Sequence, residues 1–345
     1  MLATIWFCLA ALTLTGFVLL DGFDLGAGIV QLFVAKTEND RTQILRSIGP
    51  VWDGNEVWLL VLGGGLVLAF PVLYASAFSG FYLALMIVLW LLILRGISIE
   101  FHGHVDGAAW RQFWSMVFAL ASATLALVFG IALGNVIRGV PVDATGVFFL
   151  PLWTNLSPLG RVGIIDWFTL LVGLASTLTL AIHGSLWVVL KTEGNLQERA
   201  RSFAIRCLKA LVPLMLLVTA MSFAIQPNLR RQFVAAPWGA VFPALAITGI
   251  IAERLLVQKG QELKAFLASG VSIAGMLTSA AFGLFPNVLP SSNKTDLSLT
   301  IYNAATAEHG LAIALWWFIP GMALAIGYSI LVYGRFREAA GIGTH

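Results

Sequence analysis

The sequence has little of what a soluble enzyme or a metal protein usually shows. Only 11% of its 345 residues are charged, and its two cysteines, Cys8 and Cys207, form no CxxC pair and no Cys/His cluster. We therefore infer no disulfide, no zinc site and no iron–sulfur site. The chain also lacks a Walker loop, a dinucleotide fingerprint and a nucleophile elbow, so no motif indicates nucleotide or serine-hydrolase chemistry.

What the sequence does contain is apolar residues in long runs. Hydrophobic residues make up 59% of the chain and the mean hydropathy is +0.90, which is typical of an integral membrane protein. The first run is too long and too acidic for a cleavable signal peptide, so we expect it to be a membrane helix. The loops are short, which predicts one all-α polytopic membrane domain over 1–345 with about nine spans. The runs are 5–35, 54–71, 75–99, 113–137, 163–190, 207–225, 239–257, 264–285 and 308–334.

The distribution of lysine and arginine predicts the orientation of the chain. Of the 20 basic residues, fifteen fall in connections on one side of the membrane and five on the other. Because cytoplasmic loops carry the excess of positive charge, we expect the amino terminus outside and the carboxyl terminus in the cytoplasm. The same scatter explains the net charge of +3 without a nucleic-acid partner. The five residues outside are Arg138, Arg161, Arg230, Arg231 and Lys294.

Acidic residues mark the inner ends of the second and third spans. In the segment VWDGNEVW, Asp53 and Glu56 are three positions apart and so share a helix face, and Glu100 ends the third span. An ionisable group at membrane depth indicates a functional site, and these three acids are expected at one cytoplasmic entrance. The alternative is that Asp53 and Glu56 lie among lipid headgroups and only complement the positive end of the helix. The short connection at 72–74 predicts that the two spans are antiparallel neighbours.

The first span carries two more acids in the motif DGFDLGAG. Asp21 and Asp24 share a face, and at about 1.5 Å per residue Asp21 lies roughly 20 Å from the inner end of the span. The alternative to a functional role is that both pair with a neighbouring helix and serve assembly only. Glycines of the same motif are expected to let another helix approach closely. They are Gly22, Gly26 and Gly28.

The histidines show no pattern that indicates a haem site. A haem held within a helix bundle needs axial His or Met ligands on facing helices. His183 lies inside the fifth span and His309 at the outer start of the ninth, and no paired pattern connects them. We therefore predict no firmly bound cofactor and no metal in this chain.

Six motifs, in order along nearly the whole chain, resemble subunit II of cytochrome bd-type quinol oxidases. They are DGFDLGAG at 21–28, WDGNEVWL at 52–59, AFSGFY at 77–82, GNVIRGVP at 134–141, HGSLWVVLKTEG at 183–194 and FPNVLPSS at 285–292. The resemblance implies two four-helix bundles, about 1–137 and 163–285, and a peripheral helix at about 308–334.

The resemblance also implies a function and partners. The chain would pair with a haem-bearing subunit I in a bacterial or archaeal cytoplasmic (inner) membrane, in a complex that oxidises quinol and reduces dioxygen to water. Haems b and d, or b-type haems only, would belong to subunit I, and this chain alone would be inactive. The resemblance leaves open a structurally bound quinone and a small single-helix accessory subunit.

The family's proton-route residues fall on particular positions here. The family's carboxylate in the WDGN motif corresponds to Asp53, with Trp52 and Asn55 beside it. At the end of the third helix, the family has an acidic residue five positions after an arginine. Here these two positions are Glu100 and Arg95, and the family more often has aspartate in place of Glu100. Its paired aspartates in the first helix match Asp21 and Asp24.

Two other classes of protein fit the same composition. A proton-coupled secondary transporter would use midplane carboxylates to bind substrate, but it should show inverted repeats, and DGFD and WDGN have no counterparts in the second half. A purely structural membrane partner would leave the carboxylates dispensable. The two longest connections, 138–162 and 286–307, are expected to form ordered caps or partner surfaces.

Overall fold

The computed structural model describes residues 1–154 and 162–335, which are helical apart from a short two-stranded ribbon and the loops. Arg161 and Arg337, counted above for topology, lie outside the described residues. The elements are α1 (Leu2–Val34), α2 (Glu38–Ile48), α3 (Trp52–Ala69), α4 (Pro71–Gly80), α5 (Tyr82–Phe101), α6 (Ala108–Arg138), α7 (Trp167–Lys191), α8 (Gly194–Ile225), α9 (Pro227–Ala235), η1 (Pro237–Ala240), α10 (Val241–Gln258), α11 (Glu262–Leu284), β1 (Asn287–Leu289), η2 (Thr295–Leu297), β2 (Leu299–Thr300) and α12 (Glu308–Arg335).

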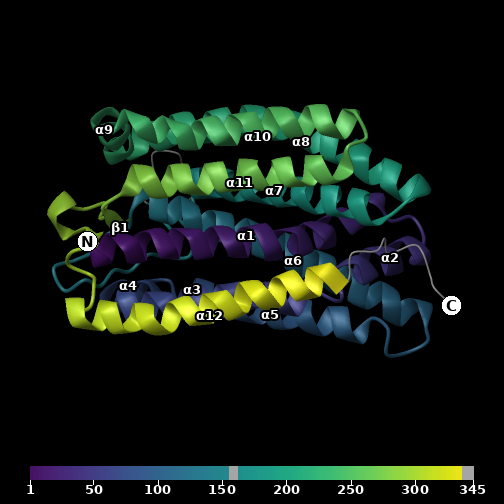
Figure 1. Ribbon diagram of the computed structural model, residues 1–345, viewed down its shortest axis with the longest axis horizontal. Helices are drawn as coiled ribbons and strands as arrows, with labels where there is room; N and C mark the ends of the chain where they lie inside the picture. Colours follow the sequence, from purple (N-terminus) through teal and green to yellow (C-terminus); the bar gives the residue numbers. More distant parts are fainter. Residues whose placement is uncertain (155–161, 336–345) are drawn as a thin grey trace.

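Among the described residues, eight helices are long and apolar enough to cross a membrane, or nine if the bent pair α2 and α3 forms one span. The helices pack as two groups: α1, α3, α5 and α6 in one, and α7, α8, α10 and α11 in the other (Figure 1). The groups meet where α7 packs against α1 and α6, and α12 lies against α3 and α1. The predicted architecture of two bundles and a peripheral helix is confirmed.

The two bundles are joined most closely where α1 crosses α7. A Cβ atom on Gly26 would lie 2.7 Å from the Cα atom of Gly184, so the two backbones are in direct contact. Gly22 makes room for the side chain of Leu180 in α7, whose Cδ2 would lie 2.9 Å from a Cβ atom on Gly22. Small residues allow such an approach because no side chain holds the helices apart. The prediction from DGFDLGAG is therefore confirmed.

The connection between the second and third spans differs from the prediction. Instead of a short turn at 72–74, the chain breaks at Phe70 and forms α4, because Pro71 supplies no amide hydrogen to continue α3 and is favourable at the start of a new helix. Consequently α3 packs chiefly on α1, and α5 on α6. The two spans still touch through Trp52, whose indole lies 3.3 Å from the position that a Cβ atom on Gly96 would take.

At the end of the molecule where α1 begins, the described parts of the two longest connections hold each other. The amide of Val140 donates to the carbonyl of Pro290 at 3.0 Å, and the amide of Ser292 donates to the carbonyl of Val140 at 2.9 Å. Together with the ribbon β1–β2 they cover the ends of the helices (Figure 1). Part of the first connection, 155–161, lies outside the described residues.

At the opposite end, Asp40 fixes α2 to α8. Its carboxylate accepts from the amides of Lys36 and Thr37, at 2.8 and 3.0 Å, and from Arg199 at 2.8 Å. Arg199 also donates to the carbonyl of Val34 at 2.7 Å. Burial alone would raise the pKa of Asp40, but the two amide hydrogen bonds and the arginine lower it below its ordinary value. The ionised carboxylate thus joins the ends of α1, α2 and α8.

We expect Asp40→Asn to destabilise the protein near neutral pH by about 1 kcal/mol, as for loss of a helix cap. Because the folded pKa of Asp40 is lowered, its contribution is present above the ordinary pKa of about 3.9 and is lost as the pH falls through the folded pKa. The melting temperatures of wild type and variant should therefore converge below about pH 4. Asp106→Asn, at an exposed surface pair, is the matched control. A difference that stays constant down to pH 3 would contradict this account.

Candidate functional site

Asp21 and Arg95 form a fully buried ion pair between α1 and α5. Nη1 of Arg95 donates to one carboxylate oxygen of Asp21 at 2.8 Å, and Nη2 donates to the other. Both side chains are 0% exposed. The two parallel contacts satisfy both carboxylate oxygens, the arrangement in which an arginine binds a carboxylate most strongly. Arg95, counted above among the loop cations, therefore lies inside α5 and pairs with Asp21 instead of with the acids at the inner end.

Asp24 lies one turn further along α1 and is held differently. The amide nitrogen of Asn55 in α3 donates to Oδ2 of Asp24 at 2.8 Å and to the carbonyl of Leu20 at 3.2 Å. The hydroxyl of Tyr333 in α12 donates to Oδ1 of Asn55 at 2.7 Å, which fixes the orientation of the amide. Oδ1 of Asp24 is buried and has no hydrogen-bond partner among the described residues. It is the open acceptor of this site.

Asp53 and Glu100 lie apart from these buried acids. Asp53 is in the first turn of α3 and Glu100 in the last turn of α5, and both are exposed. Within the described chain neither carboxylate makes a hydrogen bond or an ion pair. Trp52, next to Asp53, reaches α5 through its contact with Gly96. The structure thus places the two acids on helices that touch, and their function stays a prediction.

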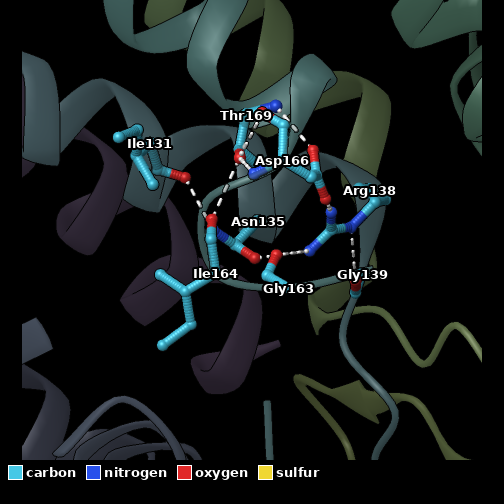
Figure 2. A network of polar contacts seen from close by, with 8 residues as sticks. All are labelled: Ile131, Asn135, Arg138, Gly139, Gly163, Ile164, Asp166 and Thr169. Carbon is cyan, nitrogen blue, oxygen red and sulfur yellow. Dashed lines mark hydrogen bonds and ion pairs between the residues drawn. The ribbon is translucent and has the colours of Figure 1, made fainter. Parts of the chain in front are cut away.

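Two features were missed by the sequence analysis. One is Tyr333, and the other is a polar network at the carboxyl-terminal end of α6. In this network (Figure 2), Arg138 pairs with Asp166 and donates to Asn135 at 2.5 Å and to the carbonyl of Gly163 at 3.1 Å. Asp166 and Thr169 cap α7 reciprocally, so the network ties the end of α6 to the start of α7. The cap could have been found, because an aspartate directly before an apolar run, here Asp166, is an N-terminal signal.

His183 is fully engaged in packing between bundles. Its Nε2 lies 3.0 Å from the carbonyl of Leu19 in α1, and its Nδ1 lies 2.6 Å from the hydroxyl of Ser269 in α11. Because a carbonyl can only accept, the ring proton belongs on Nε2. The ring also stacks on Phe266, with centroids 4.6 Å apart. His309, at the start of α12, is exposed.

Glu253 of α10 is a further buried acid that the sequence analysis missed. It is 2% exposed, and its Oε1 has no hydrogen-bond partner among the described residues. Gly249, one turn before it, touches the backbone of Ser272, so Glu253 lies in the tight contact between α10 and α11. The described residues contain no group of three or more His, Cys, Asp or Glu side chains that could hold a metal ion.

Comparison with known proteins places this arrangement in a family. The chain is 32% identical to the probable cytochrome oxidase subunit 2 of Haemophilus influenzae, covering 96% of this chain and 93% of the relative. It is 31% identical to the cytochrome bd ubiquinol oxidase subunit 2 of Bacillus subtilis (97% and 95%) and 29% identical to the cytochrome bd-I ubiquinol oxidase subunit 2 of Escherichia coli K12 (96% and 93%).

The fold is also that of a solved structure, the bd oxidase from Geobacillus thermodenitrificans. The TM-score is 0.76 at 21% sequence identity, covering 97% of this chain and 98% of that one. The family described as cytochrome bd terminal oxidase subunit II matches residues 2–336. With a match over nearly its whole length, this chain belongs to the cytochrome bd terminal oxidase subunit II family.

Proposed function

We propose that this chain is the subunit II that supports a haem-bearing subunit I in a complex oxidising quinol and reducing dioxygen to water. The proposal is supported by the match of the family over residues 2–336 and by relatives that are themselves ubiquinol oxidase subunits. The haems, of types b and d or b only, belong to the partner, and this chain binds no cofactor firmly. The complex lies in a bacterial or archaeal cytoplasmic membrane.

We further propose that the chain supplies protons from the cytoplasm to the partner's oxygen site. Reduction of dioxygen to water consumes protons, and taking them from the cytoplasm separates charge across the membrane without a pump. The observation that carries this proposal is Asp24, a fully buried carboxylate with an open oxygen that is linked to α3 through Asn55. Burying an acid of this kind in a membrane protein costs free energy, so its presence indicates a functional role.

The acids of the site divide into two roles. Asp21 is fully engaged by Arg95, so its role is to hold α1 against α5. Asp53 and Glu100 are accessible and serve as the entrance, and Asp24 is the inner acid that water would connect to them. The experiment that tests this division is turnover of the acid variants measured beside haem content, as argued in the Discussion.

The entrance acids lie on helices that this chain covers poorly. Among the described residues, α5 buries only Arg95 and Ser98, and α3 buries only three residues. A partner subunit packed on α3 and α5 would enclose Asp53 and Glu100 and dry their surroundings. The proton route would then run along the interface of the two subunits.

The proposed orientation predicts where reporters are active. A reporter that is active only in the cytoplasm should be active after His345 and inactive near Ser292, and a reporter that is active only outside should show the reverse. The reason is that fifteen of the 20 basic residues fall in the connections assigned to the cytoplasm. A phosphatase and a fluorescent protein, each placed at both sites, provide matched controls. The reverse pattern would move Asp53 and Glu100 to the outer face and end the proposal of cytoplasmic proton uptake.

A further inference from the structure

The connection after α6 contains an extended segment, residues 147–153, that is apolar on both sides. Successive side chains of an extended chain point to opposite sides, so Phe148 faces one way and its neighbours Val147 and Phe149 the other. Phe148 is buried in the core of the cap that the two longest connections form. Val147 and Phe149 are 47% and 81% exposed, and Trp153, in step with them, is 66% exposed. These three form an outward stripe that is apolar, where an extended segment facing water normally carries polar side chains.

The segment is held firmly against α4. The hydroxyl of Ser76 in α4 donates to the carbonyl of Gly146. The ring of Phe148 fills the space that a side chain on Gly80 would take, and it meets the ring of Phe81 with centroids 4.9 Å apart. A stripe that is already held in place loses little conformational freedom on binding, which favours its use as a docking surface.

The stripe lies beyond the ends of two membrane spans. α3 has 18 residues and α5 has 20, so at about 1.5 Å per residue each is roughly as long as the hydrocarbon core of a bilayer is thick. α4 joins these two helices on the cap side, and the segment packs on α4. The stripe is therefore placed to meet headgroups, water or another protein, and not the acyl chains.

A charged turn directly before the stripe argues against lipid headgroups. Oδ1 of Asp143 accepts from the hydroxyl of Thr145 at 2.6 Å and from the amides of Thr145 and Val147 at 2.8 and 3.1 Å. These hydrogen bonds lower the pKa of Asp143, which is exposed, so its carboxylate is ionised at neutral pH. Anionic headgroups attract cations and repel this fixed negative charge, whereas a protein surface can complement it.

The exposed apolar surface continues from the stripe onto the helices. Val72 of α4 is exposed and lies beside the loop, because a Cβ atom on Gly146 would be 3.9 Å from Cγ1 of Val72. Phe78 of α4 and Tyr82 at the start of α5 are exposed as well. α4 connects α3 and α5, the helices on which the partner subunit is proposed to pack. The stripe thus extends that proposed interface out of the membrane.

We propose that the outward stripe docks on an apolar patch at the outer surface of the haem-bearing subunit. The inference rests on the proposed function, because it takes that subunit as the partner that covers α3 and α5. The docking holds the two subunits together outside the membrane. It lies at the opposite end of α3 and α5 from Asp53 and Glu100 and leaves the proton entrance untouched.

Photo-cross-linking in the whole complex identifies what covers the stripe. Benzoylphenylalanine is incorporated in place of Phe149, the intact complex is irradiated, and the products are separated by denaturing electrophoresis and identified by mass spectrometry. The probe should form an adduct with the haem-bearing subunit. The matched control is the same probe in place of Trp238, an exposed aromatic residue of η1, and it should give no such adduct. η1 directly follows α9, which lies at the same end of the molecule in the second bundle (Figure 1).

Phe149→Ser provides a second measurement. The haem-bearing subunit should dissociate from this variant about tenfold faster in detergent, as for loss of an aromatic anchor, and Trp238→Ser should behave as wild type. Phe149 is largely exposed, so the variant chain itself should melt as wild type does. Adducts of the probe at Phe149 only with lipid or within this chain, or unchanged dissociation of Phe149→Ser, would overturn the inference while the proposed function stands. A wild-type chain that purifies without a haem-bearing subunit would overturn both.

Discussion

Replacing Asp53 with asparagine is expected to lower oxygen consumption with a soluble quinol by about 10²-fold or more, as for loss of a positioned proton-transfer group. Asparagine keeps the shape and the hydrogen-bonding capacity of the side chain but cannot carry the proton. Because Asp53 is exposed and makes no hydrogen bond or ion pair within the described chain, its replacement should leave haem content and assembly unchanged. Turnover and visible spectra are measured on the same preparation.

Glu100→Gln should act in the same direction, and more mildly if water bypasses the longer side chain. Asp106→Asn is the control for both variants, because Asp106 is an exposed acid in the loop after α5. Full activity in Asp53→Asn would refute its place on the proton route. Lost haem with lost turnover would instead favour a structural role for this acid.

Arg95→Met is expected to have the opposite signature, loss of assembly. It leaves the carboxylate of Asp21 without a partner in a site that is 0% exposed. Breaking a buried pair from one side costs about 3–5 kcal/mol, which is a large part of the stability of most domains. Little haem-loaded complex should therefore be recovered, and its melting temperature should be much reduced.

The double variant Asp21→Leu with Arg95→Met shows whether the defect comes from the unpaired carboxylate of Asp21 or from the loss of the arginine itself. It removes both charges, so assembly should return toward the wild-type level. A double variant as defective as the single one would contradict the ion-pair explanation. Normal assembly of Arg95→Met with low turnover would place Arg95 on the proton route.

Hydropathy was sufficient for much of the fold. Each span is a long run of apolar residues, so a sliding window finds it whatever its neighbours are. The glycines of DGFDLGAG could also be interpreted, because close packing of membrane helices requires small residues. The separate helix α4 was missed because a window of about 19 residues averages across the break at Phe81 that divides α4 from α5. Pro71 did indicate that a helix could begin there.

The partners of the acids could not be obtained from the sequence. Asp21 and Arg95 are 74 positions apart, and Asn55 and Tyr333 are 278 positions apart. Which residues meet depends on the rotation and the relative height of separate helices, and no local period encodes either. Helix length placed Arg95 near the inner end, but only the packing of α5 shows that it turns toward Asp21. Glu253 was overlooked because one acid in an apolar run forms no pattern.

The division of labour between the subunits is tested most directly by a reduced-minus-oxidised visible spectrum. The spectrum is recorded on this chain purified alone and on the complex that purifies with it. The chain alone should show no haem Soret band, because His183 is bonded through both ring nitrogens and no paired axial ligands are evident in the sequence. The complex should show the haem bands. A Soret band with stoichiometric iron in the chain alone, abolished by replacing His183 or His309, would contradict the account.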